Sequence, residues 1–417
     1  MKDFDKKTEA SLTLNDAGFF NKKAKAYALK NAIHYKGRAN AGSVISSLFN
    51  EGLKKEDIKK YSKEINEIVG YVNRLSPKEQ EKEYEKLKDI VSEREIREGL
   101  EELPDVPKSG VVMRFRPAPS GPMHVGHIIA SMITSLYVKK YGGKFYIIVD
   151  DTDPSTTLPE AYENIKRDCD WTYGNVTEYI NSSDRMDLYY SYAFSLIEKH
   201  RAYICTCSQE EFKKYADEKK DCPCRKKSER ENTREWEKMI DKKGSKEGEA
   251  VLRFKSDLGM QDPNPAMRDF PLARINEHEH ARQKKKYRVW PLMNLVVPVD
   301  DMELGMTHII RGKDHMDNAK RQRMIFDVFE KKFPWTFFMG RIKFKDLVLS
   351  KRKLNAMIDS GEFSGDDDER IPTIASLRKR GYKPEAFVKF AEQRGLSDVD
   401  KVIDSKEFFQ IIDNFNK

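Results

Sequence analysis

The stretch RFRPAPSGPMHVGH, residues 114 to 127, decides how the middle of this chain folds. It begins within a short apolar segment with strand character, Val111 to Phe115. It leads into a segment of helical period, Val125 to Tyr141. Gly142 ends that helix, and a second strand is expected over Lys144 to Val149. Strand, loop, helix and strand in this order are the first unit of a doubly wound parallel sheet. We therefore predict a Rossmann-type α/β domain.

The loop itself carries residues that suit a nucleotide. Phosphates bind backbone N–H groups at a helix N-terminus and side chains that neutralise charge. His124 and His127 are three residues apart, which puts them on one face of the first helical turn. Gly121 and Gly126 have no side chain, so an adenine could approach the backbone there. The alternative interpretation is a turn with two surface histidines.

A second polar motif, LVLSKRK at residues 347 to 353, lies more than two hundred residues further on. Negative charge builds on the phosphate oxygens when a nucleophile attacks a phosphate. A mobile lysine and two imidazoles can stabilise that charge without covalent chemistry. The alternative for this segment alone is a basic surface loop.

Four of the five cysteines form two close pairs, C-x-C and C-x-C, at Cys205, Cys207, Cys222 and Cys224. In an intracellular chain such pairs indicate a metal site rather than disulfides. Four thiolates suit tetrahedral Zn²⁺, which would clamp a small insertion and do no chemistry. The alternative is a set of four reduced structural thiols.

The composition is that of a basic chain with several domains. Lys and Arg number 77 against 69 Asp and Glu, a net charge of +8 that suits a polyanion such as nucleic acid. No run of about 18 apolar residues exists to span a membrane. The first ten residues, MKDFDKKTEA, are polar where a signal peptide is apolar. We therefore expect a cytoplasmic protein.

The domain order follows from changes in periodicity. We predict an N-terminal helical module at 1–106, a Rossmann-type catalytic domain at 107–345 and a loop with helices at 346–417. An insertion at about 203–290 carries the cysteine cluster. The strand predicted at Ala202 to Cys205 is expected to continue the alternation of the parallel sheet.

The two polar motifs carry a family resemblance. HVGH, residues 124 to 127, resembles the HIGH signature of class I aminoacyl-tRNA synthetases, and residues 347 to 353 resemble their KMSKS loop. DDTDP at 150–154, NPAMRD at 264–269 and YRVWP at 287–291 look like segments of the archaeal-type glutamyl-tRNA synthetases. This resemblance covers nearly the whole chain.

The resemblance implies particular roles for these residues. His124, His127 and Lys351 are expected to be catalytic, with ATP and Mg²⁺ as the substrate pair. The expected ATP contacts are Gly121, His124, Gly126, His127, Ser350 and Lys351.

Glutamate brings two carboxylates and one ammonium, so its pocket needs two cations and one anion. The resemblance assigns Arg114 to a substrate carboxylate and Asp150 to the ammonium. Arg311 stands where glutamyl enzymes have arginine and glutaminyl enzymes a neutral residue, which favours glutamate. The alternative is a structural ion pair at Arg311. Met293 replaces a tyrosine that contacts the amino acid in the family, and Ile148 stands where an arginine is common.

The expected reaction is ATP-dependent activation of L-glutamate and its transfer to tRNA(Glu), and the archaeal resemblance also allows tRNA(Gln). One rival is a paralogue that gives activated glutamate to a different acceptor. Another is a non-catalytic tRNA-binding subunit. Because no anticodon-binding barrel follows the helical section, we also expect a separately encoded anticodon-binding chain, with a gene cut short as the alternative. That chain is expected to dock near the apolar C-terminal helix, whose Phe408, Phe409, Ile412 and Phe415 lie within one helical stripe.

Overall fold

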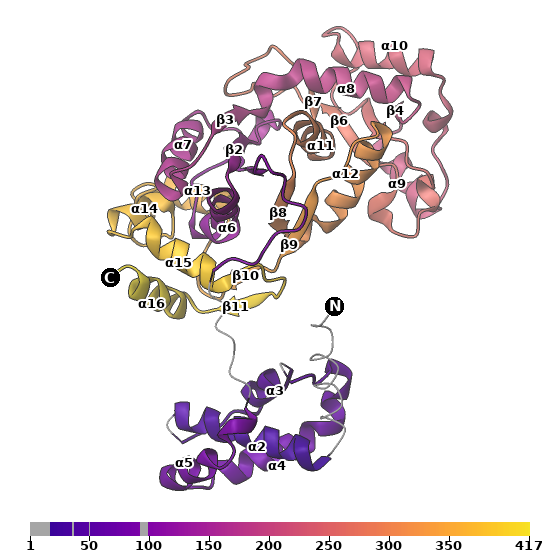
Figure 1. The fold of residues 1–417 in the computed structure, drawn as a ribbon. Coiled ribbons are helices and arrows are strands. Elements are labelled where there is room, and N and C mark those ends of the chain that lie inside the picture. Colours follow the sequence, from indigo (N-terminus) through magenta and orange to yellow (C-terminus); the bar gives the residue numbers. More distant parts are fainter. Residues whose placement is uncertain (1–16, 36, 50, 92–98) are drawn as a thin grey trace. The chain divides into compact units, whose positions relative to one another are not determined.

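The computed structural model describes residues 17–35, 37–49, 51–91 and 99–417. The chain divides into two compact units, residues 1–96 and 97–417 (Figure 1). The domain limits predicted at 106 and 345, and those of the insertion, stay predictions. Among the described helices, none is long and apolar enough to cross a membrane.

The first unit is helical. Its α-helices are α2 (Ala17–His34), α3 (Ala41–Phe49), α4 (Ile58–Val72) and α5 (Pro77–Glu85). The other three helices all contact α2, because fully buried alanines such as Ala24 and Ala28 let them approach closely. Ser76 starts α5 with a capping box in which its hydroxyl accepts from the N–H of Glu79.

The second unit begins with the predicted parallel sheet. Strands β1 (Val111–Phe115), β2 (Gly143–Val149) and β3 (Glu178–Asn181) are parallel, in the order β1, β2, β3. Helices α6 (Val125–Tyr141) and α7 (Pro159–Tyr173) connect them. Apolar side chains of α6 and of β1 and β2 share the largest core cluster, which fixes the helix on the sheet. The predicted first unit of the doubly wound fold is therefore confirmed.

A second parallel pair, β8 (His308–Gly312) and β9 (Trp335–Met339), forms a separate two-stranded sheet that lies beside β1, on the side away from β2. The Thr307 N–H donates to the Val112 carbonyl at 3.0 Å, and the Val112 N–H donates to the Thr307 hydroxyl at 2.9 Å. The strand order is thus β3, β2, β1, β8, β9, and the order reverses between β1 and β8. Ligands of doubly wound sheets bind at such a switch point, outside the carboxyl ends of the strands.

Strand β4 (Ala202–Cys205) forms where predicted, but it does not extend the parallel sheet. It starts a separate antiparallel sheet in the order β4, β5, β6, β7. The other strands and the nearby helices are β5 (Val251–Phe254), β6 (Pro271–Ile275), β7 (Val289–Pro291), α8 (Met186–Glu198), α9 (Gln209–Asp217) and α10 (Glu229–Ile240). Figure 1 shows this sheet and these helices at the end of the unit away from α14 to α16. The expected continuation was wrong because β4 pairs with a strand far along the chain, which local periodicity does not reveal.

Helices α11 (Met293–Glu303) and α12 (Met316–Val328) flank β8 in sequence and contact each other. The remaining elements of the chain are β10 (Ile342–Phe344), α13 (Lys351–Asp359), α14 (Ile374–Lys379), α15 (Pro384–Arg394), β11 (Lys401–Ile403) and α16 (Ser405–Phe415). Strands β10 and β11 form a separate parallel pair.

The apolar stripe of α16 is covered by the chain itself. Phe408 and Ile412 are fully buried in the same core cluster as α6 and α15. Phe409 and Phe415 pack against that cluster and are partly buried. The stripe is therefore part of the core of the second unit and not a free docking surface, whereas docking of a separate chain near this helix stays a prediction.

Candidate active site

The two histidines of the loop cap α6 in an unusual way. His124 is the N-cap residue, and its Nδ1 accepts a hydrogen bond from the Gly126 N–H at 3.2 Å. His127 reaches back, and its Nδ1 accepts from the His124 N–H at 3.0 Å. The ring centroids lie 3.9 Å apart. Two imidazoles thus do what a serine and a glutamate do in an ordinary capping box.

These bonds fix the tautomer of both rings. Since each Nδ1 accepts a hydrogen bond, a neutral ring carries its proton on Nε2. Burial and then the charge of Lys351 lower the pKa of His124 to about 4. Burial, His124 and Lys351 hold the pKa of His127 well below its usual value. At neutral pH the start of α6 therefore presents two uncharged imidazoles, each with an Nε2–H donor.

Lys351 lies close to both rings, at the start of α13. Its Nζ donates to the Ala118 carbonyl at 2.6 Å, and burial lowers its pKa to about 8. One turn later Asn355 Nδ2 donates to the Ser120 carbonyl at 3.0 Å. The lysine segment therefore lies directly against the loop that precedes α6.

The loop glycines face this segment. Gly121 has a φ of +139°, and a Cβ there would lie 2.5 Å from the Asn355 Oδ1. A Cβ on Gly126 would lie 3.3 Å from a methyl carbon of Leu349. Ser350 is exposed and makes no capping hydrogen bond. The space expected for an adenine above Gly121 is thus filled by Asn355, and its role in ATP binding stays a prediction.

Arg114, near the end of β1, forms an ion pair with a carboxylate of the chain itself. Its Nε and Nη2 donate to the two oxygens of Asp301 at 2.5 and 2.8 Å, and both side chains are buried. The Nη1 nitrogen has no bond to Asp301. Contact of Arg114 with a substrate carboxylate stays a prediction, and it would have to use that remaining edge.

Arg116 is a site residue that sequence reasoning missed. Its Nη1 donates to Asp300 at 2.7 Å, and its Nη2 donates to the Ser182 hydroxyl at 3.0 Å and lies 3.5 Å from Asp150. Burial opposes its charge, but Asp150 and Asp300 outweigh burial and raise its pKa. Part of the signal was local, because the R-x-R spacing at the end of β1 puts both arginines on one face of an extended chain, but their partners in α11 could not be read from the sequence.

Arg311 is a cation without a carboxylate partner. It lies near the end of β8 and is half-buried, and its Nη1 donates to the amide oxygen of Gln322 at 2.7 Å. Among the described residues it forms no ion pair. Burial and the neighbouring Arg114 lower its pKa to about 10, against the attraction of Asp301. The alternative of a structural ion pair is therefore not found in this part of the chain, and an anion could bind here.

The two residues that depart from the family pattern, Met293 and Ile148, have apolar side chains. Met293 begins α11 and is exposed, and it offers no strong hydrogen bond to a ligand. Ile148 is fully buried in a small apolar cluster with Tyr146, Met306 and Ile309. Asp150 follows β2 directly and remains partly exposed, so one acidic side chain is available at the switch point.

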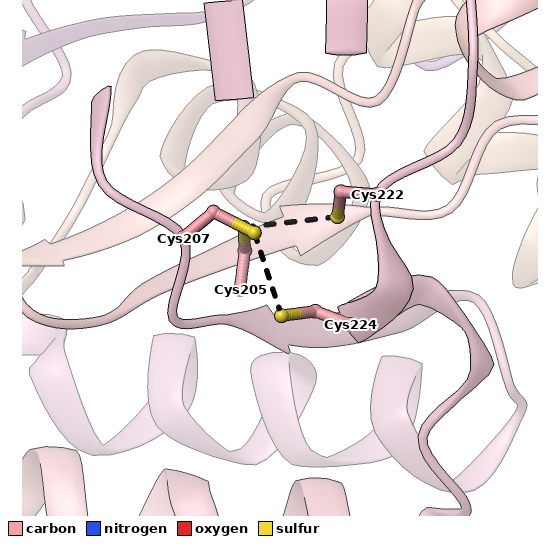
Figure 2. A group of neighbouring side chains, drawn as sticks. All are labelled: Cys205, Cys207, Cys222 and Cys224. Atoms are coloured by element: carbon pink, nitrogen blue, oxygen red, sulfur yellow. Dashed lines mark hydrogen bonds between the residues drawn. The ribbon is translucent and has the colours of Figure 1, made fainter. Parts of the chain in front are cut away.

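The four paired cysteines lie on the antiparallel sheet and do not join the other candidate residues. Cys205 ends β4, Cys222 caps a short helical turn, Pro223–Lys226, and Cys224 lies within that turn. All four sulfurs lie within 4.8 Å of one another, with 3.9 Å from Cys205 to Cys222 and 3.8 Å from Cys207 to Cys224. Figure 2 shows the four side chains turned towards one another. These distances exclude disulfides and match the separation of about 3.8 Å that Zn–S bonds of about 2.3 Å give a tetrahedral site.

A cavity of about 640 Å³ lies elsewhere, and none of the predicted site residues lines it. Its lining includes Met316 and Arg323 of α12 and the aromatic side chains of Phe333, Trp335 and Phe338. Its lining includes the amino ends of β8 and β9, whereas the candidate residues cluster at the opposite edge of the sheet.

The parallel sheet with this switch point, the histidine-capped helix and the lysine segment define a class I synthetase catalytic fold. Residues 110–414 match the family described as tRNA synthetases class I (E and Q), catalytic domain. The chain belongs to this glutamate and glutamine family.

Individual relatives agree with that family. The chain is 42% identical over 374 residues to the glutamate-tRNA ligase of Methanocaldococcus jannaschii, covering 89% of this chain and 66% of the relative. It is 40% identical to that of Methanothermobacter marburgensis, covering 92% and 69%. The chain thus spans about two thirds of the length of these curated relatives. A crystal structure of a glutamate tRNA ligase from Elizabethkingia meningosepticum shares the fold, with a TM-score of 0.53, 19% identity and coverage of 72% and 68%.

The geometry predicts how the histidines respond to loss of Lys351. In Lys351→Met the pKa of both His124 and His127 should rise, because a neighbouring cation that disfavours their charged forms is gone. Burial should still hold both values below 6.5. The measurement is an NMR titration of labelled histidine side chains. Lys353→Met, which changes an exposed lysine of the same helix, is the matched control and should leave both values in place. Unchanged values in Lys351→Met would contradict the arrangement.

Proposed function

We propose that this chain is a glutamate-tRNA ligase that activates L-glutamate with ATP and transfers it to the 3′ end of tRNA(Glu). The observation that carries the proposal is Arg311, a partly buried guanidinium at the switch point that, among the described residues, is hydrogen-bonded by a neutral amide and pairs with no carboxylate. A cation in a poorly hydrated site attracts a ligand carboxylate strongly. Family membership and the names of the curated relatives support the same activity.

Three groups are proposed to bind the amino acid. Arg311 takes the side-chain carboxylate, since it has no carboxylate partner of its own. Asp150 takes the ammonium, because it is partly exposed and its contact with Arg116 is long, at 3.5 Å. The free edge of Arg114 is left for the α-carboxylate. The charges of the three groups are opposite to those of the three charged groups of glutamate.

In the proposed first step an α-carboxylate oxygen of glutamate attacks the α-phosphorus of ATP, and pyrophosphate leaves. The Nε2–H groups of His124 and His127 donate to phosphate oxygens, where charge builds up. Lys351 exchanges its bond to the Ala118 carbonyl for a phosphate. Approaching phosphates raise its pKa from about 8, so the lysine is charged when it acts. Mg²⁺ that accompanies ATP neutralises part of the phosphate charge.

In the second step a hydroxyl of the 3′-terminal ribose attacks the carbonyl carbon of glutamyl-adenylate, and AMP leaves with the bonding electrons. The acceptor is tRNA(Glu), and tRNA(Gln) is the second tRNA that the test should include. We propose that the chain acts in the cytoplasm, because its proposed substrates L-glutamate and tRNA are found there.

The cysteine cluster is proposed to hold one structural Zn²⁺. All four thiols are free, and their sulfur separations suit a tetrahedral ion. The ion would tie the segment after β4 to the turn that carries Cys222 and Cys224. This site lies on the antiparallel sheet, so its role is to stabilise that sheet and not to take part in the reaction.

The first test is aminoacylation by the purified chain with ATP, Mg²⁺, labelled glutamate and purified tRNA(Glu) or tRNA(Gln). We expect charging of tRNA(Glu), and Lys351→Met should lower turnover by about 100-fold or more, the usual effect of losing a charge contact made in the transition state. Pyrophosphate exchange with and without tRNA is measured in parallel. Glutamate activation that never leads to charged tRNA would favour the paralogue with another acceptor, and absence of both activities would favour the non-catalytic subunit.

A second prediction concerns Arg311. In Arg311→Gln the side-chain carboxylate of glutamate loses its cation in a partly buried site, so the KM for glutamate should rise by about tenfold or more. The KM for ATP should change little. Arg230→Gln is the matched control, because Arg230 is an exposed arginine of α10 and should not affect glutamate. Unaffected glutamate kinetics in Arg311→Gln would refute the assignment.

A third prediction concerns the metal. Elemental analysis of protein purified without chelator should find close to one zinc per chain. Cys205→Ser should lose it, because three thiolates bind Zn²⁺ more weakly than four. Cys169→Ser is the control, since Cys169 is buried near Met123 and away from the cluster. Fully reduced, stable protein without any bound metal would rule out the site.

A further inference from the structure

The guanidinium of Arg311 is held by the amide of Gln322 on α12. Gln322 is almost fully buried, and its Oε1 accepts from Arg311 Nη1 at 2.7 Å. A guanidinium can only donate hydrogen bonds, so the amide oxygen must face Arg311. The amide nitrogen of Gln322 is buried and has no hydrogen-bond partner among the described residues. An unpaired buried donor is unfavourable for folding. The favourable interaction that the Gln322 amide makes is therefore its hydrogen bond to Arg311.

We propose that Gln322 is a positioning residue that makes the site selective for a carboxylate side chain. It holds the Arg311 guanidinium in place with a neutral acceptor and so leaves its positive charge for the substrate. This inference rests on the proposed function, because it concerns the amino acid that Arg311 is proposed to bind.

The carboxylates around Arg311 are engaged elsewhere. Both oxygens of Asp301 accept from Arg114, and Asp314 pairs with Arg341 at 2.9 Å. Each attracts Arg311 at longer range, which helps to keep the cation charged in a partly buried position. Neither neutralises it by direct contact. The group in direct contact is Gln322, so the residue at this position decides whether the charge of Arg311 is free or paired.

Two replacements of Gln322 separate its role in positioning the Arg311 guanidinium from its effect on the charge of that guanidinium. A glutamate at 322 would keep a hydrogen bond to Arg311 but would pair with its charge. A methionine of similar length would leave the charge but remove the acceptor, and Arg311 could then turn towards Asp301 or Asp314. The first change should therefore abolish the preference for a carboxylate. The second should weaken binding while keeping that preference.

The experiment measures binding of L-glutamate and L-glutamine to the full chain by calorimetry, with KM and kcat of aminoacylation in parallel. In Gln322→Glu the affinity for glutamate should fall by about tenfold or more, the size of a charged hydrogen bond, while the affinity for glutamine changes by less than about twofold. In Gln322→Met glutamate should weaken several-fold and still bind better than glutamine. Lys320→Met changes an exposed lysine of the same helix and is the control.

The outcomes are distinct. Equal loss of both amino acids in both variants would mean a structural role only and would overturn the inference, as would glutamate binding that matches the unmodified chain. Melting temperatures identify a variant that fails to fold, and Gln322→Met, which buries no charge, keeps the test open if Gln322→Glu unfolds. An unmodified chain that binds no glutamate would overturn the proposed function and this inference with it. An unmodified chain that binds glutamate, with variants that do so equally well, overturns this inference alone.

Discussion

Two buried ion pairs at the end of β1 hold the site together. Arg114 and Arg116 project from one face of the chain and meet Asp301 and Asp300, which are adjacent in α11. Asp300 also accepts from Arg185. Leaving one partner of such a pair buried alone costs about 3–5 kcal/mol, so these contacts fix α11 against the first half of the sheet. Because α11 precedes β8, they also fix the edge at which Arg311 emerges. The same pairs offset much of the charge of both arginines, so Arg311 is the cation there that no described carboxylate pairs with, while Arg114 keeps one edge for a ligand.

Burial sets the protonation of the other half of the site. A charged imidazole beside a partly buried lysine is unfavourable, so His124 and His127 stay neutral and act as donors through Nε2. The lysine in turn is less basic than usual until an anion arrives. His124, His127 and Lys351 would repel one another if all three were charged. Because both rings are neutral, only the lysine can carry a charge. Under the proposed function a triphosphate would reverse the balance, since it would bring negative charge close to all three groups. Asn355 and Lys351 rest meanwhile on the loop carbonyls that such a ligand would pass.

The features that the sequence predicted correctly were local patterns and short motifs. The bounds of β1 and α6 followed from periodicity and a glycine stop, and the cysteine cluster followed from spacing. The pairing of β4 with β5 could not be read from the sequence, because strand partners depend on contacts between distant segments. Arg116 and Gln322 were missed for the same reason. A buried amide looks like any polar helix residue until its partner on another strand is known. The apolar stripe of α16 was misread because an amphipathic pattern says that a face is covered, not by what.

The charge balance at the switch point argues for an acidic amino acid. Among the described residues, four guanidinium groups there face three carboxylates, apart from the neutral Asp314–Arg341 pair beside Arg311. The groups are Arg114, Arg116, Arg185 and Arg311 against Asp150, Asp300 and Asp301. One positive charge is therefore in excess, and it falls on Arg311. Glutamate carries one net negative charge, so it brings this cluster to neutrality, whereas glutamine carries none and leaves a partly buried cation uncompensated. Because the electrostatic penalty of that cation is large in a poorly hydrated site, we expect under the proposed function that the cluster as a whole favours glutamate over glutamine, beyond any single contact.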